Sequence, residues 1–285
     1  STRVRSSAAS DVYKRQFQYG VCEWSLKARG RELCRIAAEQ KLDCLQLGVG
    51  EEVLDGKGLG SPAVIEAYRQ GSAEYGVDIC SLSPQFVDQY SFTMPQGAEE
   101  ERIAAELVDR TIDLCGEFGC KSFLLPVLGK NGICDGPSFH RAAAYIKRFS
   151  EKAAERGIET HLEINQSVEQ VHNLLDAVDN PMVKIFFDSQ NLYVYDGTSM
   201  ARYFTALAGL IGGVHLKDGV GPMLSGSLLG EGTSGFFRTA RAILDSDYKG
   251  CLILESVYDK ASVCGRGAPE ELLARDAALL HRVFD

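Results

Sequence analysis

The sequence predicts a single (β/α)₈ (TIM) barrel, and three observations lead to that fold class. Short apolar or β-branched runs alternate with amphipathic helical stretches eight times along about 270 residues. No glycine-rich phosphate-binding fingerprint follows the first apolar run, although a doubly wound dinucleotide fold would often carry one there. No linker or low-complexity tract divides the repeat, so one α/β domain accounts for the whole pattern.

The expected elements follow one another in strict alternation. Runs rich in Val, Ile, Leu and Phe predict strands over 17–24, 42–48, 77–83, 120–127, 158–164, 182–188, 211–216 and 250–255. Apolar residues at helical spacing predict helices over 30–40, 61–75, 97–118, 137–156, 167–178, 200–209, 234–245 and 268–283. Each predicted strand is therefore followed by one predicted helix.

Residues typical of helix ends stand at several of these boundaries. Pro62 and Pro137 suit the first turn of a helix, because proline has no N–H to leave unpaired there. Ser167 followed by Gln170 has the spacing of a capping box. Glycine, which favours the left-handed conformation that ends a helix, follows three predicted helices, at Gly76, Gly119 and Gly157.

Residues 1–16 do not fit the alternating pattern. They are polar and without period, and they end abruptly where the first alternating run begins at Phe17. Residues 6–16 resemble the in-frame translation of a sequencing-library adapter. We therefore expect residues 1–16 to be a non-native, disordered segment and residues 17–285 to form the TIM-barrel domain.

Composition and cysteine usage indicate a cytoplasmic globular protein. The chain is 45% hydrophobic and 24% charged, which suits one large core. No apolar run reaches the roughly 20 residues of a membrane-spanning helix, and no secretory signal is recognisable, so we expect no membrane association. The nine cysteines are evenly spread and form no Cys-x-x-Cys pair, which is typical of reduced, buried thiols in an intracellular protein.

The charge of the chain argues against nucleic acid as a partner. The formal net charge is -9, and it becomes -12 when the four basic residues and one acidic residue of segment 1–16 are left out. Nucleic-acid binders usually present a basic face that neutralises phosphates. We expect a small-molecule substrate instead, and the sequence leaves open whether the protein forms a homo-oligomer.

Four consecutive predicted strands end in residues that can bind a metal ion. In chain order they are Glu163, Asp188, His215 and Glu255, each closing an apolar run. Buried carboxylates need a compensating charge, and the carboxyl ends of barrel strands meet at one mouth. Three carboxylates and one imidazole suit Mn²⁺, Mg²⁺ or Co²⁺ better than a structural zinc site, although Zn²⁺ stays open. We therefore expect one divalent cation there.

These strand ends resemble motifs of the xylose-isomerase-like superfamily of sugar isomerases and epimerases. The similar stretches are Phe187-Asp-Ser-Gln-Asn191, His215-Leu-Lys-Asp218, Leu229-Gly-Glu-Gly232 and Tyr248-Lys-Gly-Cys-Leu-Ile-Leu-Glu255. The resemblance covers the chain from about Phe17 onward. It implies that the four strand-end residues are the ligands of one catalytic divalent ion, in a metal-dependent sugar isomerase or epimerase.

The residues predict a mechanism of proton transfer by carboxylates. A cation would polarise a substrate carbonyl, one carboxylate would remove a neighbouring proton, and the other would return it through an enediolate. Glu163 and Glu255 are the predicted catalytic pair, and Asp188 and His215 hold the metal.

Five further residues are candidates for contacts with a sugar or polyol substrate. Lys217 lies two residues after His215, and so on the same strand face. Its alternative role is a salt bridge with a barrel carboxylate. Asn165 and Asn191 follow two of the ligands, Glu231 lies between two glycines, and Trp24 follows the first strand, where an aromatic wall or simple packing would suit it.

Other activities stay in view as alternatives. Ketose 3-epimerases place a histidine where this chain has Asn191, and an arginine soon after the strand-seven histidine, where residues 219–221 offer none. These departures argue against free-ketose 3-epimerisation. An inosose-type dehydratase would use the same metal and carboxylates, and a non-catalytic metal-binding barrel is a further alternative. An endonuclease IV-type enzyme would need more histidines than five and a basic groove.

Overall fold

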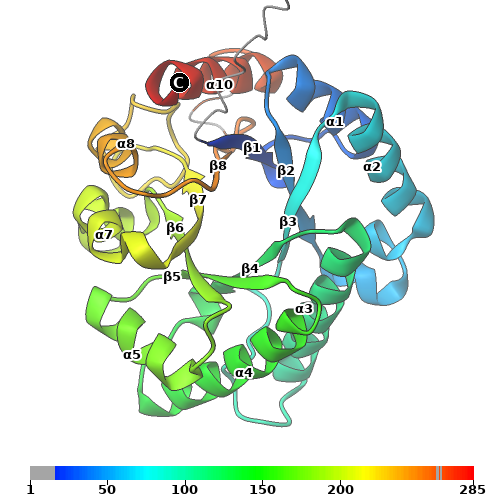
Figure 1. Cartoon of the computed structure of the whole chain (residues 1–285), viewed down its shortest axis with the longest axis vertical. Helices are drawn as coiled ribbons and strands as arrows, with labels where there is room; N and C mark the ends of the chain where they lie inside the picture. The colour runs from blue at the N-terminus through cyan, green and yellow to red at the C-terminus, as the bar shows by residue number, and fades with distance from the viewer. Residues whose placement is uncertain (1–16, 261–262, 264) are drawn as a thin grey trace, which may run out of the picture.

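The protein folds as a closed barrel of eight parallel strands with helices around it (Figure 1). A computed structural model describes residues 17–260, 263 and 265–285. The prediction of a single (β/α)₈ barrel is confirmed. The predicted non-native segment, residues 1–16, lies outside the described residues.

The strands follow chain order around the barrel, and the last strand pairs with the first. They are β1 (Gln18–Cys22), β2 (Cys44–Val49), β3 (Asp78–Pro84), β4 (Ser122–Val127), β5 (Glu159–Ile164), β6 (Val183–Asp188), β7 (Ile211–Leu216) and β8 (Cys251–Leu254). Each begins within two residues of its predicted start.

The outer layer is formed by helices that follow the strands. They are α1 (Gly30–Glu39), α2 (Pro62–Tyr75), α3 (Glu99–Phe118), α4 (Gly136–Ala154), α5 (Val168–Val178), α6 (Asn191–Asp196), α7 (Met200–Leu207), α8 (Phe236–Leu244) and α10 (Pro269–Phe284). Short 3₁₀ turns are η1 (Glu23–Ser25), η2 (Glu51–Asp55), η3 (Gly58–Gly60), η4 (Gly129–Asn131) and η5 (Ala208–Leu210). In Figure 1, α10 lies beside β1 and β8, near the C-terminus. None of the described helices is both long and apolar enough to cross a bilayer.

Helix ends follow the predicted chemistry in most places. The Ser167 hydroxyl accepts from the Gln170 N–H, and the Gln170 side chain accepts from the Ser167 N–H, which is the capping box expected at α5. Gly76 and Gly119 adopt positive φ after α2 and α3. Helix α6 was not predicted, because six residues are too few to carry a helical period.

The barrel interior has an apolar layer between its two ends. Cys22, Leu124, Phe186 and Ile253, from four different strands, form a buried cluster separate from the main core. The main core lies between the outer faces of the strands and the helices. The interior layer therefore separates the C-terminal mouth, where the strands end, from the N-terminal mouth, where they begin.

Candidate active site

Strand register brings the four predicted metal ligands together at the C-terminal mouth. Asp188 pairs with His215, and His215 pairs with Ile253, two residues before Glu255. Side chains two residues apart on a strand share a face, and the Glu255 N–H continues the ladder by donating to the Leu216 carbonyl at 3.0 Å. One ligand atom from each of Glu163, Asp188, His215 and Glu255 lies within 4.8 Å of all the others. We call these four residues the carboxylate cluster.

A glutamine on β2 orients the histidine of this cluster. The carbonyl oxygen of Gln46 lies 2.6 Å from His215 Nε2, while the Gln46 amide donates to the Ser81 hydroxyl at 3.3 Å. Because a carbonyl oxygen only accepts, Nε2 carries the hydrogen and Nδ1 of the neutral ring is left with its lone pair. Nδ1 lies 3.3 Å from Glu255 Oε2 and 3.7 Å from Glu163 Oε1. A lone pair facing two carboxylates is stabilised by a positive charge between them, either a proton or a metal ion.

Glu255 is held as a carboxylate by three neighbours. Trp24 Nε1 donates to its Oε1 at 3.1 Å, and Lys217 Nζ lies 2.5 Å from its Oε2. Burial opposes ionisation, but in protein without metal the charges of protonated His215 and of Lys217, together with these hydrogen bonds, outweigh it and lower the pKa of Glu255 to about 2. Glu255 is therefore ionised throughout the physiological range.

The pKa of Asp188 shifts in the opposite direction. Its Oδ1 accepts the N–H groups of Gln190 and Asn191 at 2.8 and 2.6 Å, at the start of α6. Its Oδ2 is buried and has no hydrogen-bond partner in the described chain, although Lys217 Nζ lies 3.0 Å away. Burial and the charges of Glu255 and Glu163 outweigh Lys217 and raise the pKa of Asp188 to about 6.

Charge and unpaired atoms show that the carboxylate cluster fits a divalent cation. Three carboxylates and the Lys217 ammonium leave two negative charges in a buried site. His215 Nδ1 and Asp188 Oδ2 are both buried without a hydrogen-bond partner among the residues described. In protein without metal, Glu255 and Glu163 overcome the effect of burial and raise the pKa of His215, so a proton competes for Nδ1. A bound dication would supply the missing charge and accept both unpaired atoms as ligands.

The structure brings most of the other predicted site residues to the same place. Asn191 Nδ2 donates to Glu163 Oε1 at 2.9 Å. Asn165 lines a small cavity together with Glu163, Asp188 and Asn191. Lys217 makes the salt bridges with barrel carboxylates described above, and its pKa is raised because Asp188 and Glu255 outweigh its burial.

Glu231 is not brought into the carboxylate cluster. Its carboxylate pairs with Arg266, and Arg275 Nη2 lies 3.2 Å from its Oε1. The arginines lower the pKa of Glu231, chiefly through the hydrogen bond from Arg266. The glycines on either side of Glu231 have a separate role, because Gly230 and Gly232 both donate their N–H groups to Asp218 Oδ2, at 3.1 and 3.0 Å. That buried carboxylate therefore fastens the loop after β7.

Gln46 is the site residue that the sequence prediction missed. It stands in the run Cys44-Leu-Gln-Leu, as a fully buried polar side chain within an apolar strand. Such a side chain requires a partner inside the barrel, and that requirement is the signal that could have identified it. Its partner, His215, lies five strands further along the chain.

Comparisons with known proteins identify the family and fold to which the chain is similar. A family model described as xylose isomerase-like TIM barrel matches residues 34–283. A 2-epi-5-epi-valiolone 7-phosphate 2-epimerase from Actinoplanes sp. is 29% identical over 244 residues, which cover 84% of this chain and 87% of that protein. Among solved structures, an L-ribulose 3-epimerase superposes with a TM-score of 0.77 at 15% identity, covering 94% of each chain. A probable 3-DHS dehydratase from Bacillus anthracis has a TM-score of 0.70 at 14% identity, covering 93% of this chain and 99% of that one. The two structural similarities show the fold alone.

Proposed function

The chain belongs to the xylose isomerase-like TIM barrel family, and from that membership we propose that it is a divalent-metal-dependent sugar isomerase or epimerase. The observation that carries the proposal is the carboxylate cluster, whose four ligand atoms lie within 4.8 Å of one another. The curated relative from Actinoplanes is by its name an epimerase, which supports the same reaction class. We take the substrate to be a small sugar or polyol derivative.

A divalent cation held by Glu163, Asp188, His215 and Glu255 would polarise a substrate carbonyl and so acidify the neighbouring C–H. Mn²⁺, Mg²⁺ and Co²⁺ suit this set of oxygen and nitrogen donors, and Zn²⁺ is tested beside them. Gln46 keeps the His215 lone pair directed at the site.

Glu163 and Glu255 are the proposed acid–base pair. Glu163 lies on β5 and Glu255 directly follows β8, so they approach the site from different sides of the barrel. Glu255 is ionised because of its contacts with Trp24 and Lys217, and it is ready to accept a proton. Asn191 donates to Glu163 and orients its carboxylate. One carboxylate removes the proton beside the carbonyl, and the other returns one to the resulting enediolate, either on the neighbouring carbon or on the opposite face of the same carbon.

Four residues beside the pair are proposed to contact the substrate. The buried, charged Lys217 would donate to a substrate oxygen, and Asn165 and Asn191 offer amides next to the carboxylates. Trp24 has its ring centroid 6.0 Å from that of His215 and would form an aromatic side of the site. Glu231 is not part of the proposal, because Arg266 and Arg275 bind its carboxylate. A cytoplasmic location and self-association stay predictions from the sequence.

Hydrogen exchange from D₂O tests the proposal. Protein stripped with chelator is supplied with each cation and incubated in D₂O with a panel of ketoses, aldoses, inososes and their phosphates. We expect deuterium at a carbon beside the carbonyl of one substrate class, with cation present and not without it. Glu163→Gln and Glu255→Gln should each lower this exchange by about 10²- to 10⁴-fold, whereas Glu169→Gln, an exposed residue in the first turn of α5, should retain it.

The products separate the competing activities. Deuterated isomer or epimer supports the proposal, whereas loss of water from the substrate would replace it with an inosose-type dehydratase on the same residues. Tight cation binding with no exchange on any compound of the panel would favour a non-catalytic metal-binding barrel.

A further inference from the structure

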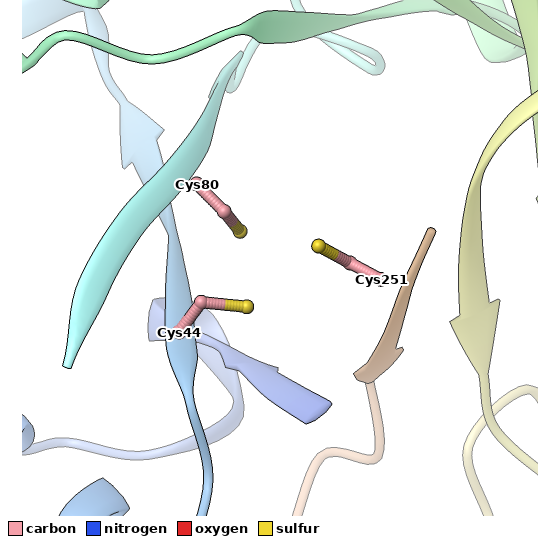
Figure 2. Close-up of side chains that lie close together, drawn as sticks. All are labelled: Cys44, Cys80 and Cys251. Carbon is pink, nitrogen blue, oxygen red and sulfur yellow. The ribbon is translucent and has the colours of Figure 1, made fainter. Parts of the chain in front are cut away.

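A second group of side chains that could hold a metal ion lies at the opposite end of the barrel. Cys44, Cys80 and Cys251 extend from β2, β3 and β8, and their sulfur atoms lie within 4.8 Å of one another. Figure 2 shows the three side chains pointing toward a common centre from separate strands. Cys44 and Cys251 are the first residues of their strands, so this group lies at the N-terminal mouth. We call these three residues the thiol cluster.

Barrel closure and a register shift assemble the thiol cluster. Both β2 and β8 pair with β1, where Gly20 is opposite Cys44 and Gln18 is opposite Cys251. Between β2 and β3 the register moves from Leu45–Ile79 to Gln46–Ser81, which leaves Cys80 as the extra residue of a bulge. A bulge redirects a side chain, and here the redirected sulfur lies with the other two.

Gly20 leaves the space that the Cys44 sulfur occupies. A Cβ atom at position 20 would lie 2.7 Å from Cys44 Sγ and 2.9 Å from the Cys44 carbonyl oxygen. Any side chain at this position would therefore displace the thiol.

The thiol cluster opens onto a cavity that reaches solvent. Cys80 and Cys251 line a cavity of about 630 Å³ together with Gln18, Glu159 and His161. His161 is buried, its Nε2 lies 2.9 Å from Glu159 Oε2, and its Nδ1 has no hydrogen-bond partner among the described residues. The cavity thus offers a route for a cation and carries a buried nitrogen with an unused lone pair in its wall.

The thiols make only weak contacts with their surroundings. Cys44 Sγ lies 3.7 Å from the Tyr19 carbonyl oxygen, Cys80 Sγ lies 3.2 Å from that of Leu45, and Cys251 Sγ lies 3.5 Å from Gln18 Oε1. Three convergent sulfurs with so little other bonding are available to a metal.

We propose that the thiol cluster binds a thiophilic d¹⁰ cation, Zn²⁺ or Cu⁺, at a site separate from the carboxylate cluster. Soft thiolate donors select these cations. With Zn–S bonds of about 2.3 Å, a tetrahedral or trigonal Zn²⁺ holds its sulfurs about 3.8 to 4.0 Å apart. Thiols that lie within 4.8 Å of one another would therefore move closer together as they bind. The three S–H protons would leave as the sulfurs bind, and water or an external ligand from the cavity would complete the coordination of Zn²⁺. The apolar layer of Cys22, Leu124, Phe186 and Ile253 separates the two sites.

Titration of the reduced full chain with Cd²⁺ tests this proposal, because sulfur-to-cadmium charge transfer absorbs in the ultraviolet and carboxylate ligands do not produce that band. We expect the band to saturate at one equivalent in the wild-type protein. Cys80→Ser and Cys251→Ser should each lose most of it. Cys134→Ser, at an exposed cysteine, and Cys22→Ser, in the apolar layer beside His215, are matched controls that should keep it. Displacement of the band by Zn²⁺ or by Cu⁺ then identifies which cation the site prefers.

X-ray absorption on the cadmium-loaded wild type provides a readout that needs no variant, and three sulfur neighbours are expected. No band at one equivalent in reduced, folded protein would overturn the proposal, as would a band that survives both Cys80→Ser and Cys251→Ser. If air oxidises two of these thiols to a disulfide and the reduced protein binds no cadmium, the proposed metal site would be replaced by an oxidisable pair of cysteines. The readouts do not depend on turnover, so the proposed isomerase function and this site can fail independently.

Discussion

The two mouths of the barrel offer metal ions opposite kinds of donor. At the C-terminal mouth, three carboxylates and an imidazole converge, with Lys217 and Trp24 bound to Glu255. At the N-terminal mouth, three thiols converge with few other bonds. Hard oxygen donors favour Mg²⁺ and Mn²⁺, and soft sulfur donors favour Zn²⁺ and Cu⁺. One fold therefore presents two clusters that differ in chemistry and are separated by an apolar layer.

The two clusters are also held in place by different parts of the structure. Two ligands of the carboxylate cluster have side-chain partners, the buried Gln46 for His215 and the half-buried Asn191 for Glu163. The thiol cluster depends on backbone geometry, since Gly20 and the bulge at Cys80 place its sulfurs. Substitutions that affect one cluster should therefore leave the other intact.

Among the substitutions, Glu255→Gln should produce the largest difference between the two clusters. The amide cannot accept the substrate proton, so exchange from D₂O should fall by about 10²- to 10⁴-fold. The cadmium–sulfur band of the thiol cluster should be unchanged. A parallel loss of that band in folded protein would mean that the two mouths are not independent.

Gln46→Leu should weaken cation binding at the carboxylate cluster alone. Leucine cannot fix the His215 ring, and losing such an orienting partner typically costs about 10- to 100-fold in metal affinity. Mn²⁺ binding measured by electron paramagnetic resonance checks this, with the exposed Gln70→Leu on α2 as control. Unchanged Mn²⁺ affinity would show that Gln46 does not orient a metal ligand.

Gly20→Ala tests the backbone support of the thiol cluster. The added methyl group would lie 2.7 Å from Cys44 Sγ, and such overpacking costs about 2 kcal/mol of the free energy of unfolding. Denaturant titration measures the loss, and Gly209→Ala, where a Cβ atom meets nothing within 4 Å, is the control. The cadmium–sulfur band should weaken, whereas Mn²⁺ binding should not.

The pH dependence of Mn²⁺ affinity tests the role of Asp188 in the carboxylate cluster. Burial raises the pKa of Asp188 to about 6, and Mn²⁺ binds only the ionised carboxylate. Mn²⁺ affinity should therefore fall as the pH drops through 6, by about tenfold per unit for each proton that must leave. Isothermal titration calorimetry between pH 7.5 and about 5 measures this. Equal affinity across that range would contradict the role of Asp188 as a ligand.

Most of the carboxylate cluster could be predicted from the sequence. Glu163, Asp188 and His215 lie in apolar strand runs and Glu255 follows one, and the shared direction of parallel strands brings their ends to one mouth. The capping box at Ser167 was also recognisable, because it depends on residues three apart. Helix α6 was missed, since its start is fixed by N–H groups donated to Asp188 and not by a periodic pattern.

The sequence by itself determined the order of strands and helices and the residues that close each strand, because these depend on local spacing. Only the tertiary structure decided which distant side chains meet. Gln46 forms a hydrogen bond with His215 across the barrel, and Glu231 forms an ion pair with Arg266. Cys251 reaches Cys44 only because β8 and β2 both pair with β1, and Cys80 joins them through a register shift. Such contacts depend on closure and register, which no local pattern encodes.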